Sequence, residues 1–517
     1  MYMYIFDRYP TMKKAFFITA MMILATLSAG AQVKFEDYFV EKTMRVDFYH
    51  AGDAETEFFY LDEVIEEPYW AGNKNYLVDD RDMGNQMFKI IDKASGKVIY
   101  SRGYSTLFSE WQAIPEAKIT SKAMPEGVVF PYPKNDVILE IYSKNFKTGL
   151  FTKKFSYEID VDHYFIRKTV PSLQTIDIQY NGHPGKCIDI VLLSEGYTAE
   201  EKDKFIEACH GFAEDIFSYE PYTSNRKKFN IRAVWVPSKD SGISIPGEHI
   251  WKNTALNVHY YTFYSERYQM TEDYQRILDV AANAPYDMIY ILTNSQKYGG
   301  GGIYNFYGIS AADIPGASTR KTYSHEFGHQ FVGLGDEYVG GSEMDGIYVQ
   351  GVEPWEPNIT TLADLDSKAW KQLLGDAPVP TPVKETNWEL NPQNPESADF
   401  NPKKPWKLGV YEGGGYVDKG VYRPWPNCMM NWFHRIDVYC PVCQYEIQQT
   451  IDLFTEQQTN ITIILWQQFP TKPRQCLRLL SESFFHTQTP QRRQVSRYIT
   501  SIRVSLTSSL QSAHSMQ

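Results

Sequence analysis

The chain has 517 residues, of which 43% are hydrophobic and 22% are charged, an ordinary globular composition that excludes a mostly disordered protein. Its formal net charge of −12 argues against nucleic-acid binding, because contacts with phosphates need a basic face. Aromatic residues make up 15% of the sequence, a bias that favours β-rich domains.

The first 31 residues have the three parts of a secretory signal peptide. Residues 12–14 (Met-Lys-Lys) form a basic start, an apolar run follows, and residues 28–31 (Ser-Ala-Gly-Ala) supply small side chains for cleavage. The apolar run is shorter than the ~20 residues that a membrane-spanning helix needs. Residues 1–11 precede the basic start as an upstream extension, which makes Met12 a candidate initiator. We therefore expect a secreted or periplasmic protein with no membrane span after cleavage.

Residues 33–170 predict an N-terminal β-sandwich. Short apolar runs recur at close spacing, and residues 87–91 and 98–100 flank the turn sequence 92–97, which indicates a hairpin. This region shows no titratable cluster with catalytic spacing. We expect a packing or recognition module.

Residues 171–455 predict an α/β domain with a mixed sheet. Strands are expected at 188–193, 229–236 and 288–292, and a helix capped by Thr198 is expected to run to about Phe217. Residues 456–517 form an atypical basic tail, rich in Gln and Ser, which we expect to be disordered. The alternative for this tail is an appendage that contacts a polyanion or a membrane.

The sequence His325-Glu326-Phe327-Gly328-His329 carries the chemistry. Residues four apart share one face of a helix, so both imidazoles can reach one metal ion, with Glu326 beside them. Tyr323 and Phe331 join Phe327 on roughly the opposite face, where they would anchor the helix in the core. The pattern predicts a metal-binding helix.

A third ligand is expected just after this helix. Gly333 can end the helix in a left-handed cap, and the carboxylates of Asp336 and Glu337 follow it. Two histidines, one carboxylate and an open position are the arrangement of a catalytic zinc ion. Asp336 is the predicted third ligand, and Glu337 and His434 are the alternatives.

Zinc at such a site lowers the pKa of a water molecule and polarises a carbonyl group. Glu326 then serves as the general base, which takes the proton of the water and passes it to the leaving amine. The predicted activity is peptide hydrolysis with an extended peptide or glycoprotein as substrate. The alternative is a non-catalytic glycan- or protein-binding protein with a structural zinc site, in which Glu326 would have no role.

Residues 325–338 resemble the corresponding motif of the IgA-peptidase family of zinc metallopeptidases. Residues 188–198, 298–305 and 422–424 are similar to further blocks of this family, and the β-rich front resembles its amino-terminal domain. The resemblance covers roughly residues 33–455. It implies an α+β protein, in which the β-sandwich precedes a zincin-like α/β metallopeptidase domain with an active-site helix.

The resemblance also implies a Met-turn beneath the metal, for which Met430 is the choice and Met429 the alternative. One departure from the pattern concerns the third ligand. Zincins of this kind commonly place it ten residues after the first histidine, where this chain has Gly335, and Asp336 comes one position later.

Two further segments leave alternatives open. The glycines at 299–302 indicate either a flexible turn or an exposed strand over Ile303–Tyr307 that pairs with an extended peptide. Cys440 and Cys443 are a redox pair, half of a zinc site or disulfide partners. A bridge from Cys428 to one of them is the simplest account after export.

Overall fold

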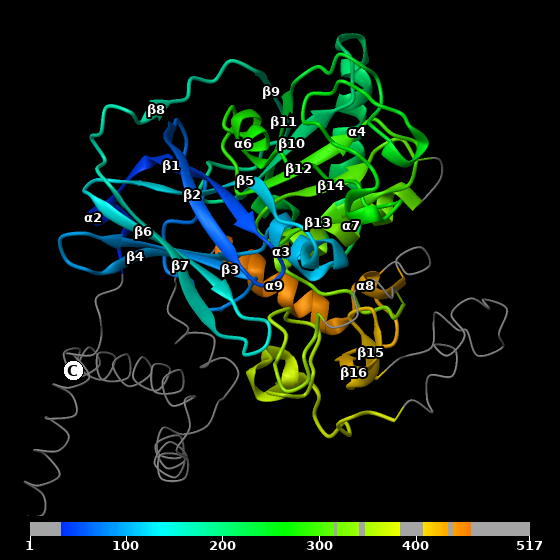
Figure 1. The fold of residues 1–517 in the computed structure, drawn as a ribbon. Helices are drawn as coiled ribbons and strands as arrows, with labels where there is room; N and C mark the ends of the chain where they lie inside the picture. Colours follow the sequence, from blue (N-terminus) through cyan, green and yellow to red (C-terminus); the bar gives the residue numbers. More distant parts are fainter. Residues whose placement is uncertain (1–32, 315–317, 341–346, 383–406, 433–437, 456–517) are drawn as a thin grey trace, which may run out of the picture. The chain divides into compact units, whose positions relative to one another are not determined.

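The computed structural model of the chain describes residues 33–314, 318–340, 347–382, 407–432 and 438–455, and Val33–Glu456 forms one compact unit (Figure 1). The predicted signal peptide and the basic tail at 456–517 lie outside the described residues. Within the described ranges, no helix has the length and apolar character that crossing a membrane requires.

The N-terminal part contains two four-stranded sheets that share one hydrophobic core (Figure 1). The buried residues of β6 (Val137–Lys144) alternate with less buried ones, as expected for a strand with one face in the core. Rings from the two sheets meet directly, with the centroids of Phe88 and Phe130 6.2 Å apart. In spatial order, the sheets consist of β5 (Lys122–Pro133), β1 (Phe39–Gly52), β2 (Glu57–Glu67) and β8 (Arg167–Lys168), and of β4 (Val98–Tyr104), β3 (Gln86–Asp92), β6 (Val137–Lys144) and β7 (Phe151–Ile159). The antiparallel β3–β4 pair confirms the predicted hairpin.

A mixed six-stranded sheet forms the centre of the C-terminal part. Its order is β13 (Gly300–Gly302), β14 (Gly308–Ala311), β12 (Met288–Thr293), β10 (Ile188–Glu195), β11 (Phe229–Trp235) and β9 (Gln174–Gln179). The four inner strands are parallel, whereas β13 and β9 pair antiparallel to their neighbours. Every residue of β10, β11 and β12 is buried, since both faces of the sheet are covered. The predicted α+β architecture with a mixed sheet is confirmed, and the boundary between residues 170 and 171 stays a prediction.

The two faces of the sheet are covered by different helices. Ile190 and Leu192 of β10 belong to the core formed with α4 (Lys202–Ile216), α7 (Ser318–Phe327) and α9 (Pro441–Thr455). Val191 and Leu193 belong to the core formed with α3 (Leu107–Ala113) and α6 (Tyr274–Ala281). Helix α3 follows β4 and therefore belongs to the N-terminal part (Figure 1). Since α3 packs on the central sheet, the N-terminal part helps to cover one face of that sheet. The other α-helices of the described residues are α2 (Phe35–Tyr38), α5 (Tyr222–Asn225) and α8 (Met429–Trp432). Strand β15 (Tyr411–Gly414) pairs with β16 (Val417–Arg423).

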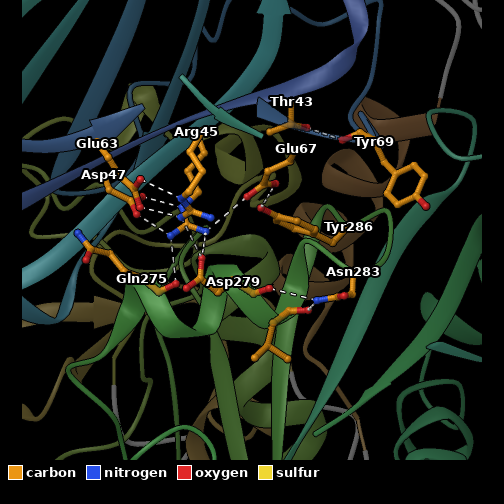
Figure 2. Close-up of polar contacts among 12 residues, drawn as sticks. Thr43, Arg45, Asp47, Glu63, Glu67, Tyr69, Gln275, Asp279, Asn283 and Tyr286 are labelled. Carbon is orange, nitrogen blue, oxygen red and sulfur yellow. Dashed lines mark hydrogen bonds and ion pairs between the residues drawn. The ribbon is translucent and has the colours of Figure 1, made fainter. Parts of the chain in front are cut away.

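A buried cluster of charges joins β1 to α6 (Figure 2). The guanidinium group of Arg45, 1% exposed, donates to both carboxylate oxygens of Asp47 at 2.6 and 2.5 Å. It also donates to Asp279 Oδ1 at 2.9 Å and to the carbonyl oxygen of Gln275 at 3.2 Å, both on α6. Glu67 lies 3.6 Å from the same guanidinium. Arg45 thus links the N-terminal sheets to the helix that covers the central sheet.

We expect Arg45→Ala to lower the free energy of unfolding by about 3–5 kcal/mol, because buried carboxylates lose their counter-charge. Lys153→Ala is the matched control, since Lys153 binds Glu140 at 2.8 Å with 51% of its side chain exposed. This exposed pair is worth less than about 1 kcal/mol. Denaturant unfolding measures both variants, and equal losses would contradict the role given to Arg45.

Glu67 predicts a pH dependence of stability. Burial raises the pKa of Glu67 from 4.5 to about 7, although Arg45 and a hydrogen bond from Tyr286 oppose the shift. A carboxyl group with a raised pKa contributes its full stability below pH 4.5 and loses it as the pH rises through 7, by at most roughly 3 kcal/mol. Glu67→Gln stays neutral, so its free energy of unfolding should fall less between pH 5 and pH 8 than that of the wild type. Parallel pH profiles of the two proteins would show that Glu67 does not titrate in this range.

Candidate metal centre

The buried face of α7 and of the helical turn that follows it carries the three aromatic residues that the sequence pattern predicted. Tyr323, Phe327 and Phe331 are at most 2% exposed. The rings of Tyr323 and Phe327 meet Phe212 of α4 edge-on, and Phe331 stacks on Phe327 at 5.2 Å. This packing holds the opposite face of the helix, which carries the histidines, in place.

The helix ends in a wider turn that shifts the residues after it. Gly328–Val332 is π-helical, and Gly333 follows with a φ of 74°, which confirms the predicted left-handed end. A π-turn contains about one residue more than an α-turn. The additional residue explains why Asp336 reaches the histidines although it stands one position later than the usual third ligand.

Three electron-rich atoms converge at one point of this structure. Nε2 of His325 and Nε2 of His329 are 3.2 Å apart. Oδ1 of Asp336 lies 3.2 Å from the first and 3.3 Å from the second. The structure therefore brings together the two histidines and the carboxylate that the sequence analysis predicted as ligands of one metal ion.

Backbone carbonyls orient both imidazole rings. Nδ1 of His325 lies 3.0 Å from the carbonyl oxygen of Met429, and Nδ1 of His329 lies 2.5 Å from that of Leu334. Because a carbonyl oxygen only accepts, each Nδ1 carries a hydrogen, and Nε2 is the atom of each ring that faces the common point and can bind a metal ion when the ring is neutral. Tyr416 donates its hydroxyl to Oδ2 of Asp336, whereas Oδ1 is buried without a hydrogen-bond partner.

Such a cluster needs a positive charge. Burial alone would lower the pKa of His329, but the carboxylate of Asp336 outweighs it and raises this pKa to about 9. Burial would raise the pKa of Asp336, yet the imidazoles of His329 and His325 hold it well below its usual range. Both directions are those expected when a proton is shared between a carboxylate and imidazoles, and a bound cation would take the place of that proton.

The spacing of the three atoms fits a tetrahedral divalent metal ion. Bonds of about 2.0–2.1 Å, which Zn²⁺ makes to imidazole nitrogen and carboxylate oxygen, place neighbouring ligand atoms about 3.3 Å apart. The observed separations are 3.2, 3.2 and 3.3 Å. The unpartnered Oδ1 of Asp336 provides the donor that such an ion needs.

Glu326 lies beside the two imidazoles and contacts the edge strand β13. One of its carboxylate oxygens is within 4.8 Å of a ring nitrogen of each histidine. A Cβ atom at Gly300 would lie 3.1 Å from this carboxylate, and one at Gly302 would lie 2.2 Å from the carbonyl oxygen of Glu326. Glycine therefore allows β13 to run directly against the helix.

The expectation of an exposed strand over Ile303–Tyr307 is wrong. Ile303, Tyr304, Phe306 and Tyr307 are at most 5% exposed and form the connection between β13 and β14. Their large apolar side chains belong in the core, and the glycines before them form the outer strand of the sheet instead.

The two neighbouring carboxylates after the helix point to different places. Asp336 faces the histidines, whereas Oε1 of Glu337 lies 3.2 Å from Sγ of Cys443 and accepts a hydrogen bond from Asn358 at 2.9 Å. This geometry favours Asp336 over Glu337 as the third metal ligand. His434 lies outside the described residues.

Met430 is fully buried directly behind the histidine helix. Its Sδ would lie 2.9 Å from a Cβ atom at Gly328, and its carbonyl oxygen accepts a hydrogen bond from the backbone of Glu337 at 2.8 Å. The expected Met-turn residue therefore lies next to the cluster, while Met429 orients His325 through its carbonyl group.

The sequence analysis did not identify two residues at the site, Tyr416 and Glu110. Tyr416 follows a run of three glycines and has a φ of 70°, and this glycine run was the signal that a backbone constraint existed there. Glu110 comes from α3 of the N-terminal part, interacts electrostatically with Glu326 and His329, and accepts a hydrogen bond from Tyr268. Burial raises the pKa of Glu110 to about 7.

Comparison with protein families decides the class of protein. Residues 176–451 match the model described as IgA Peptidase M64, and residues 34–156 match Peptidase M64 N-terminus. The chain belongs to the M64 peptidase family. M64 is a metallopeptidase family, and the matched range contains the histidines, Asp336 and Glu326. The search of curated proteins found no match.

We expect Tyr416→Phe to weaken metal binding at the M64 motif about 10- to 100-fold, because Asp336 loses the donor that orients it. Tyr132→Phe, which removes a hydroxyl donor to Val161 in the N-terminal sheets, is the matched control. Competition with a chelating dye measures the affinity of each variant for Zn²⁺. Equal affinities in the two variants would contradict the orienting role of Tyr416.

Proposed function

We propose that this M64 family member is an exported zinc-dependent endopeptidase with His325, His329 and Asp336 as metal ligands and Glu326 as general base. The convergence of the three ligand atoms within 3.3 Å, with the Glu326 carboxylate beside them, is the observation that carries the proposal. His325 and Asp336 side chains are 5% and 4% exposed, whereas His329 is 16% exposed, so a substrate approaches from the His329 side.

The chemistry divides between the ion and the chain. Bound Zn²⁺ would polarise the scissile carbonyl group and lower the pKa of a water molecule. Glu326 accepts a proton from this water and delivers it to the nitrogen of the leaving amine. Burial raises the pKa of Glu326 and Asp336 adds to the shift, while the two histidines oppose it. A raised pKa suits a carboxylate that must both take up and release a proton.

Peptides are the substrate class that family membership implies. We propose an extended segment of an extracellular protein or glycoprotein, lying near β13, which is the outer strand of the sheet and contacts Glu326. Tyr268 already bridges to Gly300 on this strand, so a substrate would meet the remaining part of its edge. Immunoglobulin A is one substrate to test, because the description of the matched family names it.

A binding protein with a purely structural metal site is the competing function. Such a site holds its ion with ligands alone and gains nothing from a carboxylate beside them. The position of Glu326 therefore favours catalysis. The sequence pattern of residues 1–31, which predicts an export signal, supports a secreted or periplasmic location in either case.

Glu326→Gln tests the proposal, because the amide keeps the shape of the side chain but cannot accept the proton. We expect cleavage of casein or immunoglobulin A to fall roughly 100- to 10,000-fold, with zinc content unchanged. A chelator should abolish cleavage by the wild type, and added Zn²⁺ should restore it. Cleavage that survives both the substitution and metal removal would overturn the assignment.

A further inference from the structure

A second group of potential ligands lies behind the catalytic motif. It consists of Glu337, Cys428, Cys440 and Cys443, each at most 1% exposed, with one donor atom of each within 4.8 Å of the others. Cys428 precedes α8, Cys440 directly precedes α9, and Cys443 lies in the first turn of α9. Segments about 90 residues apart in sequence therefore bring three thiols and one carboxylate together.

The distances within this group match a tetrahedral thiolate site. Sγ atoms of Cys428 and Cys443 are 3.7 Å apart, and Oε1 of Glu337 lies 3.2 Å from Cys443 Sγ and 3.9 Å from Cys440 Sγ. Zinc bonds of about 2.3 Å to sulfur and about 2.0 Å to oxygen give ligand separations of roughly 3.8 Å between sulfurs and 3.5 Å between sulfur and oxygen. The group has the size of a filled site without any movement of the backbone.

The surroundings suit anionic donors. Backbone N–H groups of Cys440 and Cys443 donate to the sulfurs of Cys428 and Cys440 at 3.2 and 3.4 Å, as expected where a helix N-terminus faces a thiolate. Oε2 of Glu337 is buried without a hydrogen-bond partner, although Asn358 donates to Oε1. Oε1 is thus the oxygen that faces the thiols, and a cation bound by it and the three sulfurs would supply the positive charge that a fully buried carboxylate needs.

A disulfide explains less of this arrangement. The expected bridge from Cys428 to Cys440 or Cys443 is absent, since all three cysteines are free thiols in the described structure. Any such bridge would use two sulfurs and leave one thiol facing a buried carboxylate. The sequence alone favoured the bridge because it offered no fourth ligand, and Glu337 supplies that ligand.

We propose that Cys428, Cys440, Cys443 and Glu337 form a second, structural metal site for Zn²⁺ or a similarly thiophilic divalent cation. Four protein ligands close the site to substrate, which is the arrangement of structural zinc. Soft thiolates select such a cation over Mg²⁺ or Ca²⁺.

This site would hold together the two segments that frame the catalytic motif. Glu337 is adjacent to Asp336, and Cys428 is adjacent to Met429, whose carbonyl group orients His325. The Glu337 amide also donates to Met430 at 2.8 Å. A cation bound here fixes Asp336 and Met429 from behind without contacting the substrate.

Metal analysis and zinc X-ray absorption of the purified chain test the inference. The wild type should contain about two zinc ions per chain, with sulfur scattering at about 2.3 Å. The double variant His325→Ala/His329→Ala should retain about one zinc ion, with stronger sulfur scattering, because only the thiolate site remains filled. Cys440→Ser/Cys443→Ser should lose the sulfur signal, whereas the matched control Cys187→Ser/Cys209→Ser should keep it.

The absorption spectra of the wild type and the histidine variant decide the question even if the cysteine variant does not fold. Zinc without sulfur scattering would overturn the second site and leave the proposed function intact. A disulfide between Cys428 and either Cys440 or Cys443, detected by mass spectrometry of the unreduced chain, would also overturn it. A sulfur-bound zinc as the only ion in the wild type would support this site and contradict the catalytic one.

Discussion

Two imidazole nitrogens and one carboxylate oxygen lie close together in a buried position, and the rest of the site depends on this constraint. Nε2 of His325, Nε2 of His329 and Oδ1 of Asp336 lie within 3.3 Å of one another, and water is largely excluded from them. Without a positive charge among them, these atoms repel. The π-turn after α7, the carbonyl partners of both rings and the Tyr416 hydroxyl all hold the donors in this arrangement.

The fold supplies the rigidity that the cluster needs. The ring of Tyr323 meets Tyr290 of β12, which anchors α7 on the central sheet, and the glycines of β13 let the outer strand lie directly against Glu326. The N-terminal sheets are part of the same support, because α3 covers one face of the central sheet and Arg45 binds α6. The N-terminal part therefore contributes Glu110 to the surroundings of the motif as well as packing.

Local patterns made much of this predictable from sequence. The buried run at Ile188 and the capping box at Thr198 specify their elements through neighbouring residues, and both were placed correctly. The histidine pair was visible because a helix brings positions four apart to one face. Pairings over long distances were not visible. Glu337 meets Cys428 across 91 positions, and nothing near either residue announces the other. Of the two alternatives left open for the glycine-rich segment, the exposed strand over Ile303–Tyr307 was wrong, because a short apolar run looks alike in a strand and in a buried turn.

Asp336 and Glu337 are neighbours in sequence whose side chains point to different sites, and they link the two proposed metal sites. Asp336 turns towards the histidines and Glu337 towards the thiols, so the geometry of one group restrains the other. Anomalous diffraction from a crystal, recorded above and below the zinc edge, tests the central claim most directly. A zinc peak bounded by His325, His329 and Asp336 is the predicted result. A map with no peak there, and with both imidazoles hydrogen-bonded directly to Asp336, would contradict it.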